Sequence, residues 1–183
     1  MIETSQQLAV VTGANRGLGL ETCRQLAGRG VRVVLTSRSA AQGRAAADRL
    51  QSQGLAVGYH PLDVTDPASV AALADTLRRE GRRIDALVNN AGVALEGFDA
   101  EVVRRTLAVN YFGAIDTTDQ LLPLLAPHGR IVMVSSAMGQ TDGLPPSLRD
   151  QFLDPVLTQD SLVDLLNCFV RDVEAGRHLE RGW

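Results

Sequence analysis

A glycine-rich turn directly after a short apolar run places the strongest constraint on the fold of this chain. The run covers residues 8–11 (LAVV), and the turn covers residues 12–19 (TGANRGLG). Apolar side chains then recur at helical spacing from Leu20 to Ala27, so the segment predicts a buried strand, a turn and a helix. Glycines let the backbone turn tightly and approach a pyrophosphate, and a helix N-terminus offers unpaired N–H groups and the positive end of its dipole. The octet therefore predicts a parallel sheet that binds a dinucleotide, although an ordinary strand-to-helix turn would also favour glycine.

The rest of the chain alternates strands with helices. We expect strands at residues 8–12, 31–37, 55–60, 84–89 and 130–135. Helices are expected at residues 17–29 and 40–53. A third helix is expected to follow an N-cap at Asp66, and a fourth to run from residue 99 to about residue 125. Strands that are apolar almost throughout are typical of a sheet covered on both faces, and right-handed crossovers then give the strand order 3-2-1-4-5. The expected fold class is α/β, with a doubly wound, Rossmann-like parallel sheet.

Four further motifs follow the glycine-rich turn in a fixed order. Asp63 and Val64 close the third strand, residues 89–92 (NNAG) close the fourth, Asn110 lies in the long helix, and residues 135–136 (SS) end the fifth strand. Together with the spacing Gly-x-x-x-Gly-x-Gly, this series resembles the short-chain dehydrogenase/reductase (SDR) family. The resemblance covers the chain from about Leu8 to its end. It implies an oxidoreductase that transfers a hydride between a nicotinamide and a small-molecule carbonyl or alcohol.

The segment after Ser136 departs from the regular alternation. We expect a dinucleotide-binding domain over residues 1–138, and a loop plus helix insertion of the same domain over residues 139–183. A loop is expected at residues 139–146, and an amphipathic helix is expected to start at Asp160 and end near Gly176. Such an insertion resembles the carbonyl-reductase branch of the family, where it covers an oligomerisation surface and so implies a monomer. The alternative interpretation is a poorly ordered tail.

Cofactor selection is expected to depend on two arginines. In dinucleotide folds, an acidic residue about 20 positions beyond the glycine loop binds the ribose of NAD, whereas an arginine suits the 2′-phosphate of NADP. Arg38 follows the second strand with no carboxylate beside it, and Arg16 in the glycine loop is a second cation, so NADP(H) is expected rather than NADH. The resemblance implies the following cofactor-binding residues: Gly13, Asn15, Arg16, Gly17, Leu18, Gly19, Arg38, Asp63, Val64, Asn90, Ala91 and Gly92. Asp63 would bind the adenine amino group, although it also fits an ordinary turn.

The resemblance also implies catalytic roles for Ser136 and Asn110. The serine hydroxyl would hold the substrate oxygen, and the asparagine, expected to point inward from the helix, would organise a water. In the family a tyrosine donates the proton, and a lysine four positions later, in the motif Tyr-x-x-x-Lys, lowers the tyrosine pKa. This sequence contains no lysine, and its tyrosines are Tyr59 and Tyr111, neither of which follows the serine.

Two function classes therefore stay open. The first is an NADPH-dependent carbonyl reductase whose sequence stops before the catalytic tyrosine and the C-terminal strands, and which is inactive alone. The second is a non-catalytic dinucleotide-binding or partner-binding module, in which the edge of the fifth strand could pair with another chain.

Nucleic acid and membranes are not expected partners. The net charge is −3 at pH 7, and no apolar run approaches the length that spans a membrane. The first residues lack the basic and apolar regions of a signal peptide, so a cytoplasmic location is expected. Cys23 and Cys168 lie on apolar stripes of expected helices and are interpreted as small core residues; no disulfide or metal site is expected.

Overall fold

The computed structural model describes residues 7–183, which divide into two compact units. The first unit consists of residues 7–93 and 108–134, and the second unit consists of residues 94–107 and 135–183. The prediction that residues 139–183 are an insertion of a single domain stays a prediction.

The first unit is built around a parallel sheet of five strands in the order β3-β2-β1-β4-β5. The predicted strand order and fold class are therefore confirmed. The strands are β1 (Leu8–Val11), β2 (Arg32–Ser37), β3 (Val57–Pro61), β4 (Ile84–Asn89) and β5 (Leu125–Met133). The helical elements of this unit are α1 (Gly17–Gly28), α2 (Ala40–Gln51), α3 (Pro67–Arg79), the π-helical turn η1 (Ala108–Phe112), α5 (Gly113–Leu121) and the 3₁₀ turn η2 (Leu122–Leu124).

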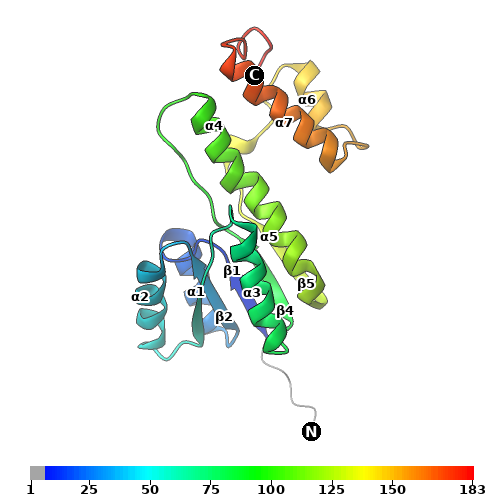
Figure 1. The fold of residues 1–183 in the computed structure, drawn as a ribbon. Helices are drawn as coiled ribbons and strands as arrows, with labels where there is room; N and C mark the ends of the chain where they lie inside the picture. The colour runs from blue at the N-terminus through cyan, green and yellow to red at the C-terminus, as the bar shows by residue number, and fades with distance from the viewer. Residues whose placement is uncertain (1–6) are drawn as a thin grey trace. The chain divides into compact units, whose positions relative to one another are not determined.

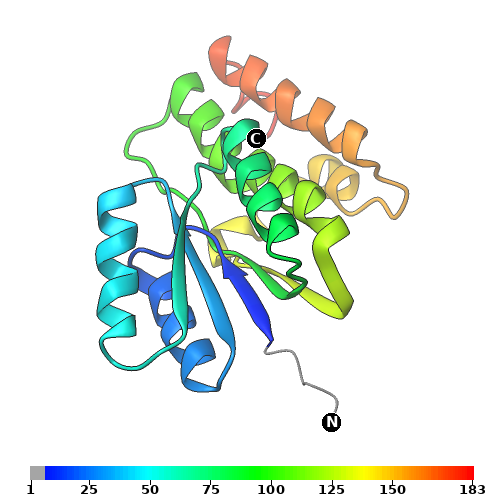
Figure 2. The ribbon, with the colours of Figure 1, turned by 60° about the horizontal axis from the view of Figure 1, so that its bottom comes forward.

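Helices cover both faces of this sheet, as Figures 1 and 2 show. Alternate residues of β1 enter two different cores: Leu8 and Val10 pack with α3 and α5, whereas Ala9 and Val11 pack with α1 and α2. Successive side chains of a strand point to opposite faces, so a strand buried on both sides must be apolar at every position. The sheet brings its loops together at the carboxyl ends of the strands, where ligands bind in folds of this class.

The long helix is interrupted at the predicted site residue Asn110. Helix α4 (Ala100–Leu107) leads into η1, and α5 and η2 follow. A π turn inserts one extra residue into a helix and is often found at functional sites. Gly113 starts α5 in close contact with Val64, because a Cβ atom on Gly113 would lie 2.9 Å from the Val64 carbonyl oxygen. The apolar periodicity alone predicted one uninterrupted helix, and this part of the prediction is wrong.

Strand β5 begins earlier than the sequence predicted. Ile84 pairs with Leu125 and Ala86 pairs with Arg130, so the register shifts between these pairs. The irregular residues between them include His128, whose φ is +67°. A Pro-His-Gly sequence alone predicts a loop. It becomes part of β5 because the residues on either side of it pair with β4.

The second unit consists of three helices and a cluster of aromatic side chains. Its elements are α4, the 3₁₀ turn η3 (Ala137–Gly139), α6 (Pro146–Phe152) and α7 (Gln159–Glu174). Helix α7 lies where the amphipathic helix was predicted and is capped by Thr158, whereas α6 was not predicted. Arg104 of α4 forms an ion pair with Glu174 of α7.

Asp172 is a buried carboxylate in the second unit, with 5% of its surface exposed. Trp183 Nε1 donates a hydrogen bond to Asp172 Oδ2 over 2.9 Å, and Arg177 Nη2 lies 3.4 Å from Oδ1. The Trp183 hydrogen bond, with help from the charges of Arg177 and Arg181, lowers the pKa of Asp172 against the opposing effect of burial. The ring of Trp183 also contacts Phe169, at 5.0 Å between centroids.

Replacing Trp183 by Phe is expected to raise the pKa of Asp172, because the ring is kept and the donor is lost. A carboxylate whose folded-state pKa is lowered stabilises the fold above its unfolded pKa of about 3.9, and this stabilisation is lost as the pH falls through the folded value. Trp183→Phe should therefore move acid unfolding of the second unit to higher pH. NMR titration of the Asp172 carboxyl carbon measures the shift directly; an unchanged pKa would contradict this assignment.

Cys23 belongs to the core beneath α1, as predicted, and burial raises the pKa of its thiol to about 12. Cys168 is half-buried in α7, and both cysteines are free thiols. Among residues 7–183, no helix has the length and apolar character needed to cross a membrane.

Candidate cofactor site

A cleft of about 330 Å³ opens at the carboxyl ends of the strands in the first unit. We call it the glycine-loop cleft. It brings together all of the predicted cofactor residues except Leu18 and Gly19, and adds Leu62, Val93 and Val109, which sequence reasoning missed. Its lining residues are Gly13, Asn15, Arg16, Gly17, Arg38, Leu62, Asp63, Val64, Asn90, Ala91, Gly92, Val93 and Val109.

Two glycines of the loop adopt conformations that other residues rarely take. Gly13 has a φ of +61°, and a Cβ atom there would lie 2.7 Å from the Cα of Ala91. Gly17 has a φ of +59°, with open space where its side chain would be. The first glycine therefore permits close packing of the loop against residues 90–92, and the second permits the turn into α1.

The N-terminus of α1 has the features of an anion site. Its N-cap residue is Arg16, and within the described chain no side chain caps it and no acidic residue lies in its first turn. The first N–H groups of a helix have no partner within the helix, and the helix dipole places positive potential there. The loop and the helix start therefore fit a pyrophosphate.

Thr12 joins the two walls of the cleft and was not among the predicted site residues. Its hydroxyl accepts hydrogen bonds from the backbone N–H groups of Asn90, over 3.0 Å, and of Ala91, over 2.9 Å. In return, Asn90 Nδ2 donates to the carbonyl oxygens of Thr12, over 2.8 Å, and of Gly13, over 3.2 Å. Thr12 is 1% exposed, so these bonds are shielded from water. The position of Thr12 before the first glycine was the available signal for this role.

Gly19 leaves the space that the Asn90 side chain needs to form these hydrogen bonds. A Cβ atom on Gly19 would overlap Asn90 Nδ2 and would lie 2.9 Å from the Cα of Ala14. Leu18, in contrast, is 73% exposed at the start of α1. Neither residue lines the cleft, so Gly19 acts through Asn90.

Two guanidinium groups line the glycine-loop cleft, which also contains the carboxylate of Asp63. Arg16 and Arg38 both line it and both are exposed. Ser39, which follows Arg38, caps α2, and the first turn of α2 contains no acidic residue. Guanidinium groups bind phosphate through charge-assisted hydrogen bonds, so this donor set fits a phosphate on the adenosine ribose.

Asp63 serves the turn after β3 and also lines the cleft. Its Oδ1 accepts hydrogen bonds from the Thr65 N–H, over 3.0 Å, and from the Thr65 hydroxyl, over 2.7 Å. The turn interpretation and the cofactor interpretation are therefore compatible, because the same carboxylate is half-buried at the cleft.

Asn110 is exposed, so the expectation of an inward-pointing, buried amide is wrong. Its side chain pairs with the backbone of Val93: Asn110 Nδ2 donates to the Val93 carbonyl over 2.9 Å, and the Val93 N–H donates to Asn110 Oδ1 over 2.8 Å. The π turn places the amide beside the loop that follows β4. Asn110 therefore fixes a segment that lines the cleft.

Ser136 lies in the second unit, at the start of η3. Its hydroxyl oxygen accepts a hydrogen bond from the Met138 N–H over 3.2 Å, which leaves the hydroxyl proton able to donate. Ser136 and its neighbour Ser135 are both exposed.

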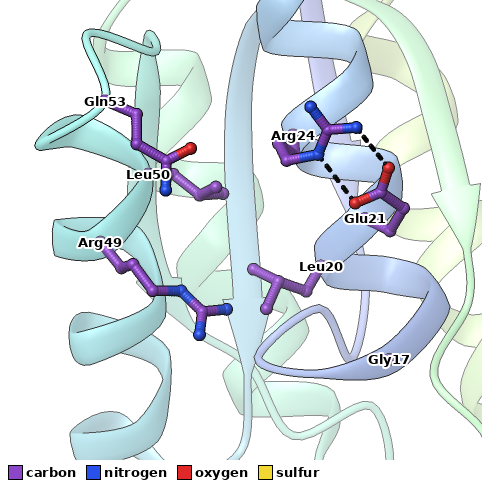
Figure 3. A pocket seen from close by; sticks show the side chains of 7 residues that line it. All are labelled: Gly17, Leu20, Glu21, Arg24, Arg49, Leu50 and Gln53. Atoms are coloured by element: carbon purple, nitrogen blue, oxygen red, sulfur yellow. Dashed lines mark hydrogen bonds and ion pairs between the residues drawn. The ribbon is translucent and has the colours of Figure 1, made fainter.

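A separate groove of about 350 Å³ lies between the sides of α1 and α2 (Figure 3). Gly17 is the one predicted residue that lines it. Glu21 accepts two hydrogen bonds from Arg24, and these contacts together with Gln25 lower the pKa of Glu21 to about 2. The two charged side chains of α1 are thus paired with each other in this groove. The predicted cofactor residues lie together in the glycine-loop cleft instead.

Comparison with known families decides the classification. The family model for short chain dehydrogenases matches residues 7–145, which include the glycine loop, the Asn-Asn-Ala-Gly segment and Ser136. The chain belongs to the short-chain dehydrogenase family. The resemblance predicted from the motifs is therefore confirmed.

Relatives in this family include carbonyl reductases. Carbonyl reductase [NADPH] 1 of Homo sapiens is 41% identical over 189 residues, which cover 96% of this chain and 66% of the human protein. The chain thus spans about two thirds of the length of this relative. Among solved structures, salutaridine reductase from Papaver somniferum matches with a TM-score of 0.91 and 29% identity, over 97% of this chain and 74% of that one. Menthone neomenthol reductase from Mentha piperita matches with a TM-score of 0.90 and 31% identity, over 98% of this chain and 78% of that one.

Proposed function

We propose that the glycine-loop cleft binds NADP(H) and that this chain is the cofactor-binding part of an NADPH-dependent carbonyl reductase. The observation that carries the proposal is the placement of Arg16 and Arg38 on one cleft with an uncapped helix N-terminus. The name of the human relative, carbonyl reductase [NADPH] 1, supports the same cofactor. When bound, NADPH supplies a hydride to a carbonyl carbon, and the substrate is a small-molecule carbonyl or, in the reverse direction, an alcohol.

Different residues of the cleft would bind different parts of the cofactor. The N–H groups at the start of α1 would hold the pyrophosphate, Arg16 and Arg38 the 2′-phosphate, and Asp63 with the Val64 backbone the adenine. The wall formed by Asn90, Ala91 and Gly92 is kept in place by Thr12.

Ser136 and Asn110 would assist the reaction without supplying the proton. The Ser136 hydroxyl would donate a hydrogen bond to the substrate oxygen, and Asn110 would position the loop at Val93. A serine hydroxyl and an amide are too weakly acidic to protonate an alkoxide at neutral pH, so turnover needs a separate general acid.

A binding module that pairs through its sheet edge is the second candidate function. Strand β5 is one of the two edge strands of the sheet. Its residues Ile131, Val132 and Met133, and Val134 directly after it, are 40–51% exposed. Exposed apolar edge strands pair readily with other chains. Sedimentation analysis separates the candidates: we propose a monomer, and concentration-dependent association that Val132→Lys removes would favour the module.

Reversing the charge at position 38 is expected to remove the preference for NADPH. If Arg16 and Arg38 each contribute a charge-assisted hydrogen bond of about 1.5–3 kcal/mol, each guanidinium group on its own favours NADPH over NADH by more than about tenfold. Arg38→Asp should weaken NADPH by at least that factor and leave NADH within a few-fold. Titration of cofactor fluorescence measures both affinities.

Arg49→Asp is the matched control, because it makes the same charge change on α2 outside the cleft. Equal affinity of the unmodified chain for NADPH and NADH would overturn the assignment of the two arginines.

A further inference from the structure

The groove between helices α1 and α2 shares only Gly17 with the glycine-loop cleft, and it combines apolar surface with polar groups. We call it the α1–α2 groove; its volume is about 350 Å³. Leu20 of α1 and Leu50 of α2 provide its apolar part, and Figure 3 shows both side chains between the two helices. Leu50 is 2% exposed, whereas Leu20 is half-buried. A hydrocarbon group in the groove would therefore remove apolar surface of Leu20 from water, which is favourable.

Two hydrogen-bond donors at the C-terminal end of α2 extend into this groove. Figure 3 shows the Arg49 guanidinium reaching from α2 toward Leu20, with the Gln53 amide on the same side of the groove. Within residues 7–183, the side chains of Arg49 and Gln53 form no hydrogen bond or ion pair. A guanidinium group binds a carboxylate through two parallel charge-assisted hydrogen bonds. These two donors therefore fit a carboxylate.

The α1 side of the groove favours a ligand with a single negative charge. Arg24 donates to the Glu21 carboxylate over 2.8 Å and 2.6 Å, so these two charges compensate each other. Arg49 is then the one uncompensated charge among the lining residues. A second negative charge on the ligand would meet the Glu21 carboxylate without a free cation to bind it.

The size of the groove favours a small molecule over a protein partner. Small-molecule sites have volumes of about 300–1,000 Å³, and this groove falls in that range. A stable protein interface takes about 20–30 residues from each side. Seven residues line the groove, which is too few for such an interface.

We propose that the α1–α2 groove is a binding site for an amphipathic monocarboxylate. Its carboxylate would pair with Arg49 and Gln53, and its hydrocarbon part would cover Leu20. The inference does not rest on the proposed function, because none of these three residues lines the glycine-loop cleft. Cofactor titrations without added carboxylate leave the groove empty, so Arg49→Asp stays a valid control for the cleft.

Octanoate and octanamide are matched probes, because they share the hydrocarbon chain and differ in the charge of the head group. NMR titration of the backbone and arginine Nε–H signals should show that octanoate shifts the signals of Leu20, Arg49 and Gln53. Octanamide should bind about tenfold more weakly, because it lacks the charge-assisted hydrogen bonds.

A pair of arginine variants tests the contact with the carboxylate. Arg49→Gln should weaken octanoate to about the affinity of octanamide, which itself should change by less than about twofold. Arg29→Gln is the matched control, because Arg29 is an exposed arginine directly after α1 and does not line the groove. It should leave the affinity for both probes unchanged.

Glu21→Gln should increase the affinity for octanoate, which a misfolded variant could not do. The substitution removes the charge that compensates Arg24 and makes a second guanidinium available to the ligand. Octanoate should then bind roughly threefold more tightly, while octanamide should be unaffected.

Four results would overturn the proposal. They are the absence of octanoate binding, equal affinity for octanoate and octanamide, equal octanoate affinity of Arg49→Gln and Arg29→Gln, and octanoate-induced shifts confined to the glycine-loop cleft. Concentration-dependent self-association that Arg49→Gln removes would also overturn it, because the groove would then hold a second copy of the chain.

Discussion

The 183-residue chain is expected to consume NADPH with quinones and dicarbonyls at least about 10²-fold more slowly than human carbonyl reductase 1 under the same conditions. General-acid assistance contributes on the order of 10²–10⁴ in rate, and the residues proposed for this site do not provide it. The sequence contains no lysine that could lower the pKa of a tyrosine. The measurement is the loss of NADPH absorbance with each substrate, after cofactor binding has been verified by titration.

Tyr111 is the tyrosine that could challenge this expectation, since it neighbours Asn110 in the π turn. Adjacent residues of a helical turn point in different directions, and the Asn110 amide is hydrogen-bonded to the backbone of Val93. The Tyr111 ring instead packs edge-on against Phe112, at 5.0 Å between centroids. Burial raises the pKa of Tyr111, which makes it a weaker acid at neutral pH.

Tyr111→Phe is the control for that alternative. The variant should leave the slow background rate unchanged, because the hydroxyl takes no part in it. Rapid turnover by the unmodified chain that Tyr111→Phe abolishes would show that Tyr111 is the acid and that the proposed division of roles is wrong.

The sheet and most of the cleft could be predicted because both depend on local sequence. A strand buried on both faces must be apolar, and glycines at positions 13 and 17 mark backbone with positive φ. Once the strand order is known, the carboxyl ends of neighbouring strands meet at one edge, and the residues that follow them are brought together.

The features that sequence missed depend on partners that lie far along the chain. The Thr12 hydroxyl binds residues 78 and 79 positions away, and Asn110 binds Val93 across 17 positions. Apolar periodicity predicts an inward face for Asn110, but a π turn changes the phase of the helix and brings its amide to an exposed loop. The early start of β5 likewise depends on a register shift against β4.

Replacing Gly19 by Val is expected to abolish dinucleotide binding while most of the fold is retained. The new side chain would overlap Asn90 Nδ2 and crowd the Cα of Ala14, so Asn90 must leave the carbonyl oxygens of Thr12 and Gly13. Overpacking of this kind costs about 1–3 kcal/mol, which a domain of this size can survive. The cleft wall at Asn90 and Ala91 would move, and we expect the affinity for NADPH to fall by about 100-fold or more, equivalent to about 2.8 kcal/mol.

Gly28→Val is the matched control, because Gly28 lies at the other end of the same helix with open space around its Cβ position. It should keep both the circular dichroism spectrum and the affinity. Gly19→Ala should weaken binding less than Gly19→Val, since the clash begins at Cβ and grows with the branched side chain. If Gly19→Val binds NADPH as tightly as Gly28→Val, then Asn90 does not need its bonds to the glycine loop, and the loop is an ordinary turn between a strand and a helix.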